Sequence, residues 1–493
     1  MKKIALLLCL LLFSHSFADD KLDKIIQEFD TYAETQRDLW QVPGMAISIV
    51  KGDEVLLSKG YGKRGLKDTR PVNEKTLFQI GSLTKAFTAT LVTKGIELNW
   101  FKWDDKVVNH MPTFRLHDPF ASTEFEMIDL LAQRSGLPSY AGDTQAFLGY
   151  SQKEMFQHMH FLQPVSSFRS KFGYQNIFFL VAAHILEKKA GMTFAALLEE
   201  EIFTPLKMTN SNASLREFLA ADNRAEWLMR LDDGSTITLE EDFPYRNWNY
   251  VLGPAGGINS TAADMANWMI LQANSGKFNG KQLFSSTNMQ LLTKPMIYVG
   301  EMRGLSLYYA LGWVHMENSP YAIIWHDGST LGVYNVAAFI PEEKLGIVIL
   351  SNVRNTQLAY ALALQFFDMY FGKQNQNWGK KLLPTYTKET KEETGTKTAA
   401  RPLSIYAGTY SNPIYGNVVV REEEGHLVMV IGKTSQRLSL NPWGGDVFTM
   451  LWPYVDDKGS KVVFSSNDEN KIAKMNITLF DKDGTGDFIR ISE

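Results

Sequence analysis

A serine and a lysine stand three residues apart in the segment FQIGSLTKAFT, residues 78–88. The pattern of residues 82–97 predicts a helix, and side chains three positions apart are neighbours on a helix. We therefore expect Nζ of Lys85 to lie near Oγ of Ser82. Serine is a poor nucleophile until a base takes its proton, and a lysine in a dry pocket near a helix N-terminus has a lowered pKa and can act as that base. The pair predicts acyl transfer through a covalent ester on Ser82.

The same Ser-x-x-Lys spacing also occurs at Ser48 and Lys51. That pair falls in a predicted strand, where positions i and i+3 point to opposite faces. Its two side chains cannot converge, so spacing alone is weak evidence for a site. Whether the two side chains can meet depends on whether the pair lies in a helix or in a strand.

Two further segments could complete such a site. Tyr174-Gln175-Asn176 precedes a strongly apolar predicted helix, where Tyr174 could be a second proton carrier. Taken alone, Tyr174 is more simply a packing aromatic and Asn176 a helix cap. The segment His326-Asp327-Gly328-Ser329 ends a predicted strand; Gly328 would let a substrate approach the backbone closely, and the N–H of Ser329 could point into the site. An isolated histidine is usually structural.

Both strands and helices are predicted around these residues and must position them. Residues 45–62 read as two strands around the turn Lys51-Gly52-Asp53, residues 321–351 read as strands again, and residues 356–372 as an amphipathic helix. The stretch from about 105 to 290 reads as mainly helical with long loops. Early and late strands would share one antiparallel sheet, which differs from the alternation of a doubly wound fold. The pattern predicts an α+β fold with a helical lobe.

Four segments are expected along the chain of 493 residues. Residues 1–18 resemble a secretory signal, with Lys2 and Lys3 before ten apolar residues and a small-residue cut site. Residues 19–372 would form the catalytic domain, and the polar, Thr-rich residues 373–401 a linker. Residues 402–493 contain about eight short strand-like runs, which predict a small all-β barrel or sandwich.

Composition excludes several classes of function. The net charge is -4 and no basic block is concentrated anywhere, which argues against a nucleic-acid partner. Cys9, the single cysteine, lies inside the predicted signal, so disulfides, cysteine nucleophiles and thiolate metal sites are excluded from the mature chain. We expect export to the periplasm or the medium, no membrane span, and no metal or organic cofactor.

Taken in order, these segments resemble the serine β-lactamase and penicillin-binding protein superfamily, in particular its class C-like branch. The similarity covers about residues 40–372. Besides the three motifs it rests on the ordered stretches VPGMAISIVKGDEVLLSKGYG, LLAQRSGLPSY, PAGGINSTAADMANW, YALGW and FIPEEKLGIVILSN. The C-terminal segment resembles, more loosely, the lipocalin-like barrels appended to some members. Such a barrel could shape substrate access or oligomerisation, or be a passive stabilising domain.

The resemblance implies a role for each residue of the site. Ser82 would be the acylated nucleophile, and Lys85 and Tyr174 would share proton transfer. Asn176 would hydrogen-bond the substrate or orient Lys85. The N–H groups of Ser82 and Ser329 would form the oxyanion hole. His326 and Gly328 would line the substrate edge.

One departure from the family pattern concerns the substrate. Many β-lactamases and DD-peptidases have Lys-Thr-Gly where this chain has His326-Asp327-Gly328. That lysine helps to hold a substrate carboxylate, whereas histidine is shorter and mostly neutral at pH 7, and Asp327 adds a negative charge. The resemblance includes esterases and D-amino-acid peptidases with His-x-Gly at this place.

The function expected from the sequence is that of a serine hydrolase acting through an acyl-enzyme on an ester, an amide or a D-amino-acid-containing peptide. A β-lactamase or DD-carboxypeptidase is the alternative, and a binding or sensor protein that is acylated once without turnover is a second one. Small molecules or peptides, including peptidoglycan-derived ones, are the expected partners, and the oligomeric state is open. An α/β-hydrolase is excluded, because the chain has no Gly-x-Ser-x-Gly nucleophile elbow and the strand layout differs.

Overall fold

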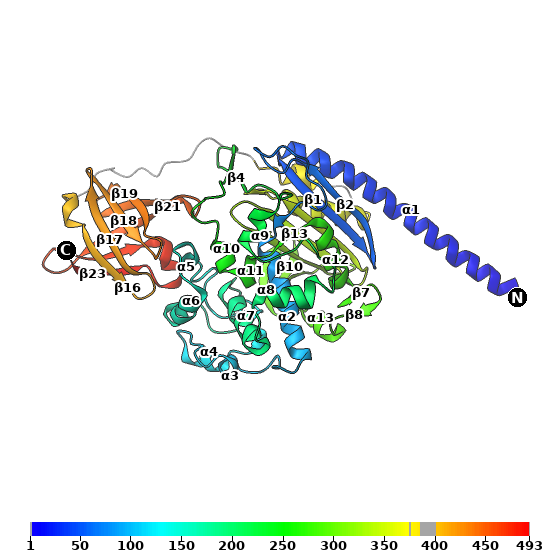
Figure 1. Ribbon diagram of the computed structural model, residues 1–493, viewed down its shortest axis with the longest axis horizontal. Coiled ribbons are helices and arrows are strands. Elements are labelled where there is room, and N and C mark those ends of the chain that lie inside the picture. Colours follow the sequence, from blue (N-terminus) through cyan, green and yellow to red (C-terminus); the bar gives the residue numbers. More distant parts are fainter. Residues whose placement is uncertain (1, 374–375, 385–400, 493) are drawn as a thin grey trace.

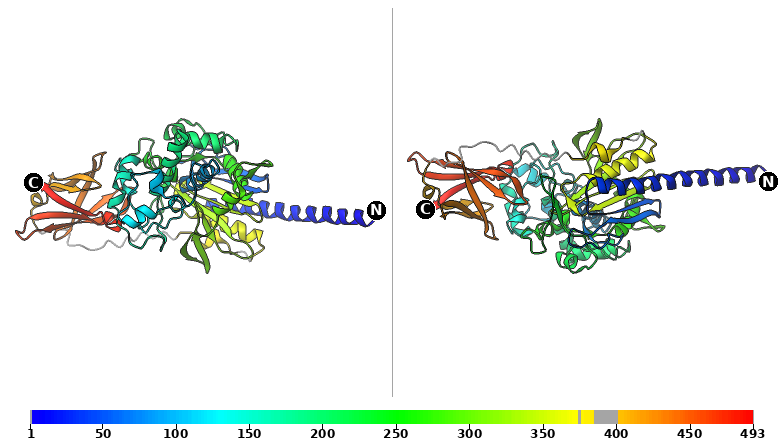
Figure 2. Two further views of the ribbon diagram at one scale, coloured as in Figure 1. Left: turned by 90° about the horizontal axis from the view of Figure 1, so that it is seen from below. Right: turned by 90° about the horizontal axis from the view of Figure 1, so that it is seen from above.

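The computed structural model describes residues 2–373, 376–384 and 401–492, which form a larger α+β domain and a smaller barrel (Figure 1). The long helix α1 (Lys2–Leu39) runs from the larger domain away from the rest of the molecule. The barrel lies at the opposite end, and the views of Figure 2 agree on this arrangement. In the described part of the chain, no helix is long and apolar enough to cross a membrane.

An eight-stranded antiparallel sheet forms the centre of the larger domain, in the order β2-β1-β14-β13-β12-β11-β10-β9. The early strand β1 pairs with the late strand β14, with Ile47 opposite Ile349, which confirms the predicted shared sheet. The turn at Gly52 joins β1 to β2 as predicted. The strands are β1 (Gly44–Lys51), β2 (Glu54–Gly62), β9 (Ile297–Met302), β10 (Leu305–Tyr309), β11 (Val314–Met316), β12 (Ile323–Ser329), β13 (Tyr334–Ile340) and β14 (Leu345–Ser351).

Helices cover both faces of this sheet. Along β13, Ala337 and Phe339 face the core shared with α12 (Ala262–Ala273) and α2 (Thr84–Glu97), while Val336 and Ala338 face α1 and α14 (Leu358–Tyr370). This alternation is the period of two expected of a strand, and because both faces are covered, both are apolar. The predicted helix at residues 356–372 is therefore confirmed as α14.

A helical lobe with long loops lies beside one end of the sheet. Its apolar helix α7 packs against α2 and α11. The helices of this region are α3 (Val107–His110), α4 (Pro119–Glu124), α5 (Thr144–Phe147), α6 (Gln152–His158), α7 (Ile177–Ala190), α8 (Phe194–Leu198), α9 (Leu215–Ala220), α10 (Trp248–Val251), α11 (Gly253–Gly256) and α13 (Ser286–Leu291). Short strands join the loops: β3 (Phe78–Gln79), β4 (Leu228–Arg230), β5 (Thr236–Thr238), β6 (Asn259–Ser260), β7 (Lys277–Phe278), β8 (Lys281–Gln282) and β15 (Val353–Arg354).

The segment predicted as a linker begins with a packed element. The short helix α15 (Trp378–Lys381) contacts α14, and the carbonyl of Gly379 accepts a hydrogen bond from the Trp40 indole at 2.8 Å. The packing of the larger domain thus continues past residue 372. Residues 374–375 and 385–400 of the predicted linker lie outside the described residues.

The C-terminal strands form a closed barrel, because β16 pairs with both β17 and β23. Side chains alternate along each strand, so that Leu427, Met429 and Ile431 of β18 are buried inside it. The predicted run of about eight strands is confirmed. They are β16 (Gly408–Asn412), β17 (Gly416–Glu423), β18 (His426–Ile431), β19 (Gln436–Gly444), β20 (Val447–Trp452), β21 (Asp456–Ser466), β22 (Ile472–Ile477) and β23 (Asp487–Ser492).

The barrel is docked on the helical lobe through direct contacts. The Trp452 indole donates a hydrogen bond to the Tyr245 hydroxyl at 2.7 Å, and the hydroxyls of Tyr415 and Thr144 are 2.8 Å apart. The backbone N–H of Lys433 donates to the carbonyl of Leu148 at 2.8 Å. These bonds, two of them buried, and the aromatic packing around them fix the barrel against the lobe.

Candidate active site

Ser82 lies in a single 3₁₀ turn, η1 (Gly81–Leu83), that leads directly into α2. Gly81 has φ +56°, a conformation that glycine adopts at no steric cost. A Cβ at Gly81 would also lie 2.7 Å from the backbone nitrogen of Ser329. Position 81 therefore requires glycine for two reasons, its backbone conformation and the close approach of Ser329. The absence of a side chain at this position lets the end of β12 lie against the turn that carries Ser82.

Lys85 is fully buried beneath this turn. Its Nζ lies 3.1 Å from Oγ of Ser82 and donates to the carbonyl of Ala255 at 2.9 Å. Burial lowers the pKa of Lys85 to about 7, against the opposing charges of Asp143 and Asp327, which favour the protonated form. A large fraction of Lys85 is then neutral at pH 7, and a neutral amine beside a hydroxyl is what a general base requires.

Tyr174 completes the immediate surroundings of the pair. Nζ of Lys85 lies 4.7 Å from the centre of the Tyr174 ring. Burial raises the pKa of Tyr174 well above its usual value, while a hydrogen bond with Ser82 acts in the opposite direction. The phenol is therefore held in its neutral form. A neutral hydroxyl can relay a proton, by donating its own proton while it accepts another. Ser82, Lys85 and Tyr174 are brought together as the sequence predicted.

Asn176 is the N-cap residue of α7, and its side-chain amide does not reach Lys85 in the described contacts. It donates instead to Oδ2 of Asp143, at 2.6 Å, and both side chains line the same cavity as Ser82. Of the two roles implied for Asn176, the geometry favours contact with the substrate over orientation of Lys85.

His326 is buried between the sheet and the aromatic side chains of the site. Its Nδ1 lies 2.5 Å from the carbonyl oxygen of Asp327, and since a carbonyl only accepts, Nδ1 carries a proton. Burial lowers the pKa of His326 well below its usual value. In the neutral ring Nε2 is then an acceptor, and the hydroxyl of Tyr309 donates to it at 3.2 Å. His326 thus offers no positive charge near neutral pH.

The strand end that follows His326 passes very close to the serine turn. A Cβ on Gly328 would lie 2.0 Å from the carbonyl oxygen of Ile80, so only glycine fits there. Ser329 lines the cavity next to Ser82. Ser82 and Ser329 thus line one cavity from two elements, which makes their backbone amides the candidate pair of oxyanion donors.

These groups open into a cavity of about 620 Å³. Its catalytic end is aromatic and acidic, and its other end is formed by the barrel. The lining residues from the larger domain include Ser82, Tyr140, Asp143, Tyr174, Asn176, Tyr309, His326, Asp327, Ser329 and Arg354, and those from the barrel are Tyr454, Val455, Leu479 and Lys482.

Sequence reasoning missed several of these residues. Tyr309 stands in the quoted stretch YALGW and Ala255 in PAGGINSTAADMANW, so their segments were recognised but not their roles. Tyr140 ends the quoted stretch LLAQRSGLPSY, again without a recognised role, and Asp143 lies just beyond it in a loop with no recognised motif. The barrel residues carry no signal at all, because nothing in a strand pattern says which loop will face another domain.

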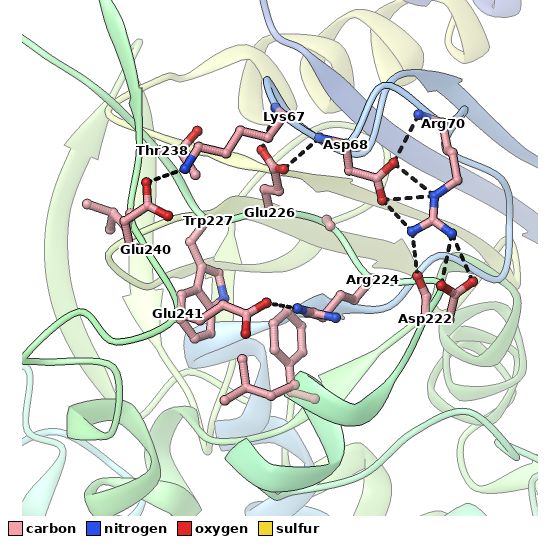
Figure 3. A pocket seen from close by; sticks show the side chains of 14 residues that line it. Lys67, Asp68, Arg70, Asp222, Arg224, Glu226, Trp227, Thr238, Glu240 and Glu241 are labelled. Carbon is pink, nitrogen blue, oxygen red and sulfur yellow. Dashed lines mark hydrogen bonds and ion pairs between the residues drawn. The ribbon is translucent and has the colours of Figure 1, made fainter.

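A second cavity, of about 370 Å³, lies away from Ser82 and is shown in Figure 3. Its charged side chains are paired with one another: Lys67 with Glu240, Arg70 with Asp68 and Asp222, and Arg224 with Glu241. Glu226 accepts hydrogen bonds from the backbone of residues 66–68. These contacts hold the loop after β2 in place and leave the first cavity as the candidate active site.

Comparison with known protein families shows which family the chain belongs to. The family model described as "Beta-lactamase" matches residues 29–365, and the chain belongs to that family. A second model, described as "Domain of unknown function (DUF3471)", matches residues 392–489 and spans most of the barrel.

Individual relatives are distant. The chain is 26% identical over 453 residues to the Unguisins hydrolase ungD' of Aspergillus campestris, covering 85% of this chain and 82% of that protein. It is 24% identical over 340 residues to the Protein flp of Staphylococcus aureus, covering 67% and 63%. The solved structure of the octameric penicillin-binding protein homologue from Pyrococcus abyssi superposes with a TM-score of 0.62 at 20% identity, over 94% of this chain and all of that one. At that identity the last comparison shows a shared fold.

Proposed function

We propose that this protein is a serine hydrolase that forms a covalent acyl-enzyme on Ser82 and acts on an ester, an amide or a D-amino-acid-containing peptide. The observation that carries the proposal is the contact of 3.1 Å between Nζ of Lys85 and Oγ of Ser82, with a pKa of Lys85 of about 7. Family membership and the hydrolase name of a relative support hydrolysis as the reaction.

Acylation would proceed by addition to the substrate carbonyl, followed by loss of the leaving group. Neutral Lys85 takes the proton of the Ser82 hydroxyl while Oγ bonds to the carbonyl carbon of the substrate. The negative charge on the carbonyl oxygen is stabilised by the amides of Ser82 and Ser329. The bond to the leaving group then breaks, and the proton passes to that group through Lys85 and the Tyr174 hydroxyl.

Deacylation would repeat these steps with water. Water gives a proton to the same base as it attacks the ester carbon, and Oγ of Ser82 leaves and recovers its proton. Lys85 and Tyr174 are both in place for this second half, which favours turnover over the alternative of a protein acylated once and not released.

The surroundings of His326 support an ester or peptide substrate over a β-lactam. A neutral imidazole bonded to Tyr309 cannot hold a carboxylate as a lysine does, and Asp327 beside it would repel one. A β-lactamase or DD-carboxypeptidase remains the alternative. We further propose that residues 1–18 are a signal that directs export to the periplasm or the medium, which N-terminal sequencing of the mature protein would test.

The proposed function is tested with a short-chain nitrophenyl ester and a chromogenic cephalosporin, using the wild type and Ser82→Ala. We expect the ester to be hydrolysed with a transient mass adduct on Ser82, and Ser82→Ala to lose about 10³-fold or more of that rate. Little cephalosporin turnover is expected. Rapid cephalosporin hydrolysis would identify a β-lactamase instead, and a stable adduct without turnover would identify the sensor.

A further inference from the structure

Among the described residues, Lys482 is the one barrel lysine that lines the cavity of Ser82. It lies in the 3₁₀ turn η6 (Thr478–Asp483), which follows β22, and its side chain is exposed. Among the described residues no carboxylate lies within ion-pair distance of its ammonium group, although other barrel lysines such as Lys471 and Lys474 have such partners.

Lys482 is joined to the catalytic groups by two aromatic contacts. Its Nζ lies 5.9 Å from the centre of the Tyr140 ring, and that ring lies 5.3 Å from the ring of Tyr174. The N–H of Tyr140 also donates to the carbonyl of Tyr174 at 2.7 Å, which fixes the two residues together. The wall from Tyr174 to Lys482 is thus a continuous surface, and about three extended residues at ~3.3–3.6 Å each would span these two contacts.

Charge is divided between the two ends of this surface. The catalytic end holds Asp143 and Asp327 with a neutral His326, so it repels a free carboxylate. The barrel end holds Lys482, and Arg354 lies in the same lining, where its Nη1 donates to the carbonyl of Tyr454 at 3.3 Å. Many β-lactamases and DD-peptidases have a lysine where this chain has His326 on β12. Here the lysine lies across the cavity, at Lys482.

We propose that Lys482 binds the free carboxylate of a short peptide substrate and thereby sets the specificity of the site. This deepens the proposed function and rests on it, because the peptide is the substrate that Ser82 would cleave. In a peptide the free carboxylate belongs to the leaving group, so Lys482 would hold the part that departs. The barrel is then a component of the active site rather than a passive appendage.

The docking of the barrel makes this arrangement usable. The bonds from Trp452 to Tyr245 and from Lys433 to Leu148 fix the barrel before any substrate arrives. A cation held in place binds a carboxylate without the cost of ordering a domain. The long lysine side chain still lets Nζ adapt to peptides of slightly different length.

The test compares N-acetyl-tri-D-alanine that has a free carboxylate with the same peptide carrying a C-terminal amide. Hydrolysis is followed by mass spectrometry in the wild type, Lys482→Gln, Lys482→Glu and the control Lys471→Gln, which removes an exposed barrel lysine outside the cavity. We expect the wild type to prefer the carboxylate by roughly 10-fold in kcat/KM, as a charge-assisted hydrogen bond would give. Lys482→Gln should lose the preference, Lys482→Glu should reverse it, and Lys471→Gln should keep it.

A second measurement separates this inference from the proposed function. Nitrophenyl acetate has no carboxylate, so its hydrolysis reports whether Ser82 is the nucleophile, and the control Lys471→Gln should hydrolyse it at the wild-type rate. For the Lys482 variants the readout is the ratio of kcat/KM for the two peptides, which a general change in rate does not move. Both peptides are also titrated calorimetrically into Ser82→Ala and Ser82→Ala/Lys482→Gln, which needs no turnover. If nitrophenyl acetate is not cleaved, the proposed function fails while the titration still decides the role of Lys482. Equal affinity for the two peptides, no binding of either, or an unchanged preference in Lys482→Gln would overturn the inference.

Discussion

Two Ser-x-x-Lys pairs in this chain have the same spacing and opposite structural outcomes. In the turn that leads into α2, Oγ of Ser82 and Nζ of Lys85 are 3.1 Å apart. In strand β1, Ser48 bonds to Ser58 and to the carbonyl of Ala262, at 2.9 and 2.8 Å, on one face of the sheet. Lys51 emerges on the other face, where it bonds to Glu343 and Tyr370, each at 2.9 Å. The backbone conformation, and not the spacing, decides whether the two side chains meet.

The surroundings separate the two lysines further. Burial without a paired carboxylate lowers the pKa of Lys85 to about 7. Partial burial also acts to lower the pKa of Lys51, but its hydrogen bonds with Tyr370 and Glu343 outweigh that effect and raise the pKa. One lysine is prepared to exchange a proton near pH 7, and the other is held as a permanent cation.

The largest expected effect comes from removing each amine in turn. Lys85→Met should lower kcat/KM for a nitrophenyl ester by about 10²–10⁴-fold, the usual contribution of a general base. The fold should survive, because Met is apolar and of similar length in a fully buried position. Lys51→Met should retain wild-type activity, and thermal unfolding of both variants is the control. Equal losses in the two variants would show that Lys85 contributes no more to catalysis than a distant lysine.

The second effect is on the pH dependence of kcat/KM. The neutral form of Lys85 is the active one, so activity should rise with pH through about 7 and fall about tenfold per unit below it. Asp327→Asn removes a negative charge that favours protonated Lys85, so this limb should move to lower pH. Lys51→Met should leave the limb where it is. Initial rates between pH 5 and 9 test this. If the rising part of the pH profile were the same in Asp327→Asn as in the wild type, its assignment to Lys85 would be contradicted.

Much of the larger domain and its site could be predicted from the sequence, because the signals are local. The period of two in β13 and β14, the turn at Gly52 and the helical spacing of Ser82 and Lys85 all follow from a few neighbouring residues. Tyr174 and His326 required the order of several motifs along the chain. Their approach to Lys85 depends on how α7 packs against α2 and how β12 packs against the turn η1, which no single segment encodes.

The part that could not be predicted is the junction of the two domains. The sequence predicted the barrel strands, but it did not predict that Lys482 faces Tyr140 or that Trp452 bonds to Tyr245. These contacts join residues hundreds of positions apart through loops, and a loop pattern carries no record of its partner. Likewise, the side chain of Asn176 bonds to Asp143 and not to Lys85, and this depends on the path of the loop that carries Asp143.

A smaller effect is expected from Ser48, on stability and not on catalysis. Its hydroxyl donates to the carbonyl of Ala262 and lies 2.9 Å from Oγ of Ser58, and Ser48 is buried. Ser48→Ala removes this second bond from a carbonyl that also accepts within the first turn of α12, so the free energy of unfolding should fall by about 0.5–1.5 kcal/mol. Ester hydrolysis at 25 °C should be unchanged. Denaturant unfolding monitored by fluorescence measures the loss, and reduced activity in a fully folded sample would mean that the second pair also contributes to the site.

The smallest effect is expected from Lys51→Met, measured as stability. The ion pair of Lys51 with Glu343 is partly exposed, and such pairs contribute only about 0–1 kcal/mol because water screens the charges. Glu343 would also keep its hydrogen bond from the Tyr370 hydroxyl, at 2.6 Å, so no buried charge is left without a partner. We therefore expect a shift in the denaturation midpoint close to the experimental error, and smaller than that of Ser48→Ala. High salt should shrink it further, since it acts on the ion pair and not on the hydroxyl of Ser48. A loss above that of Ser48→Ala would mean that Lys51, although on the opposite face from its serine, is a structural centre of the sheet.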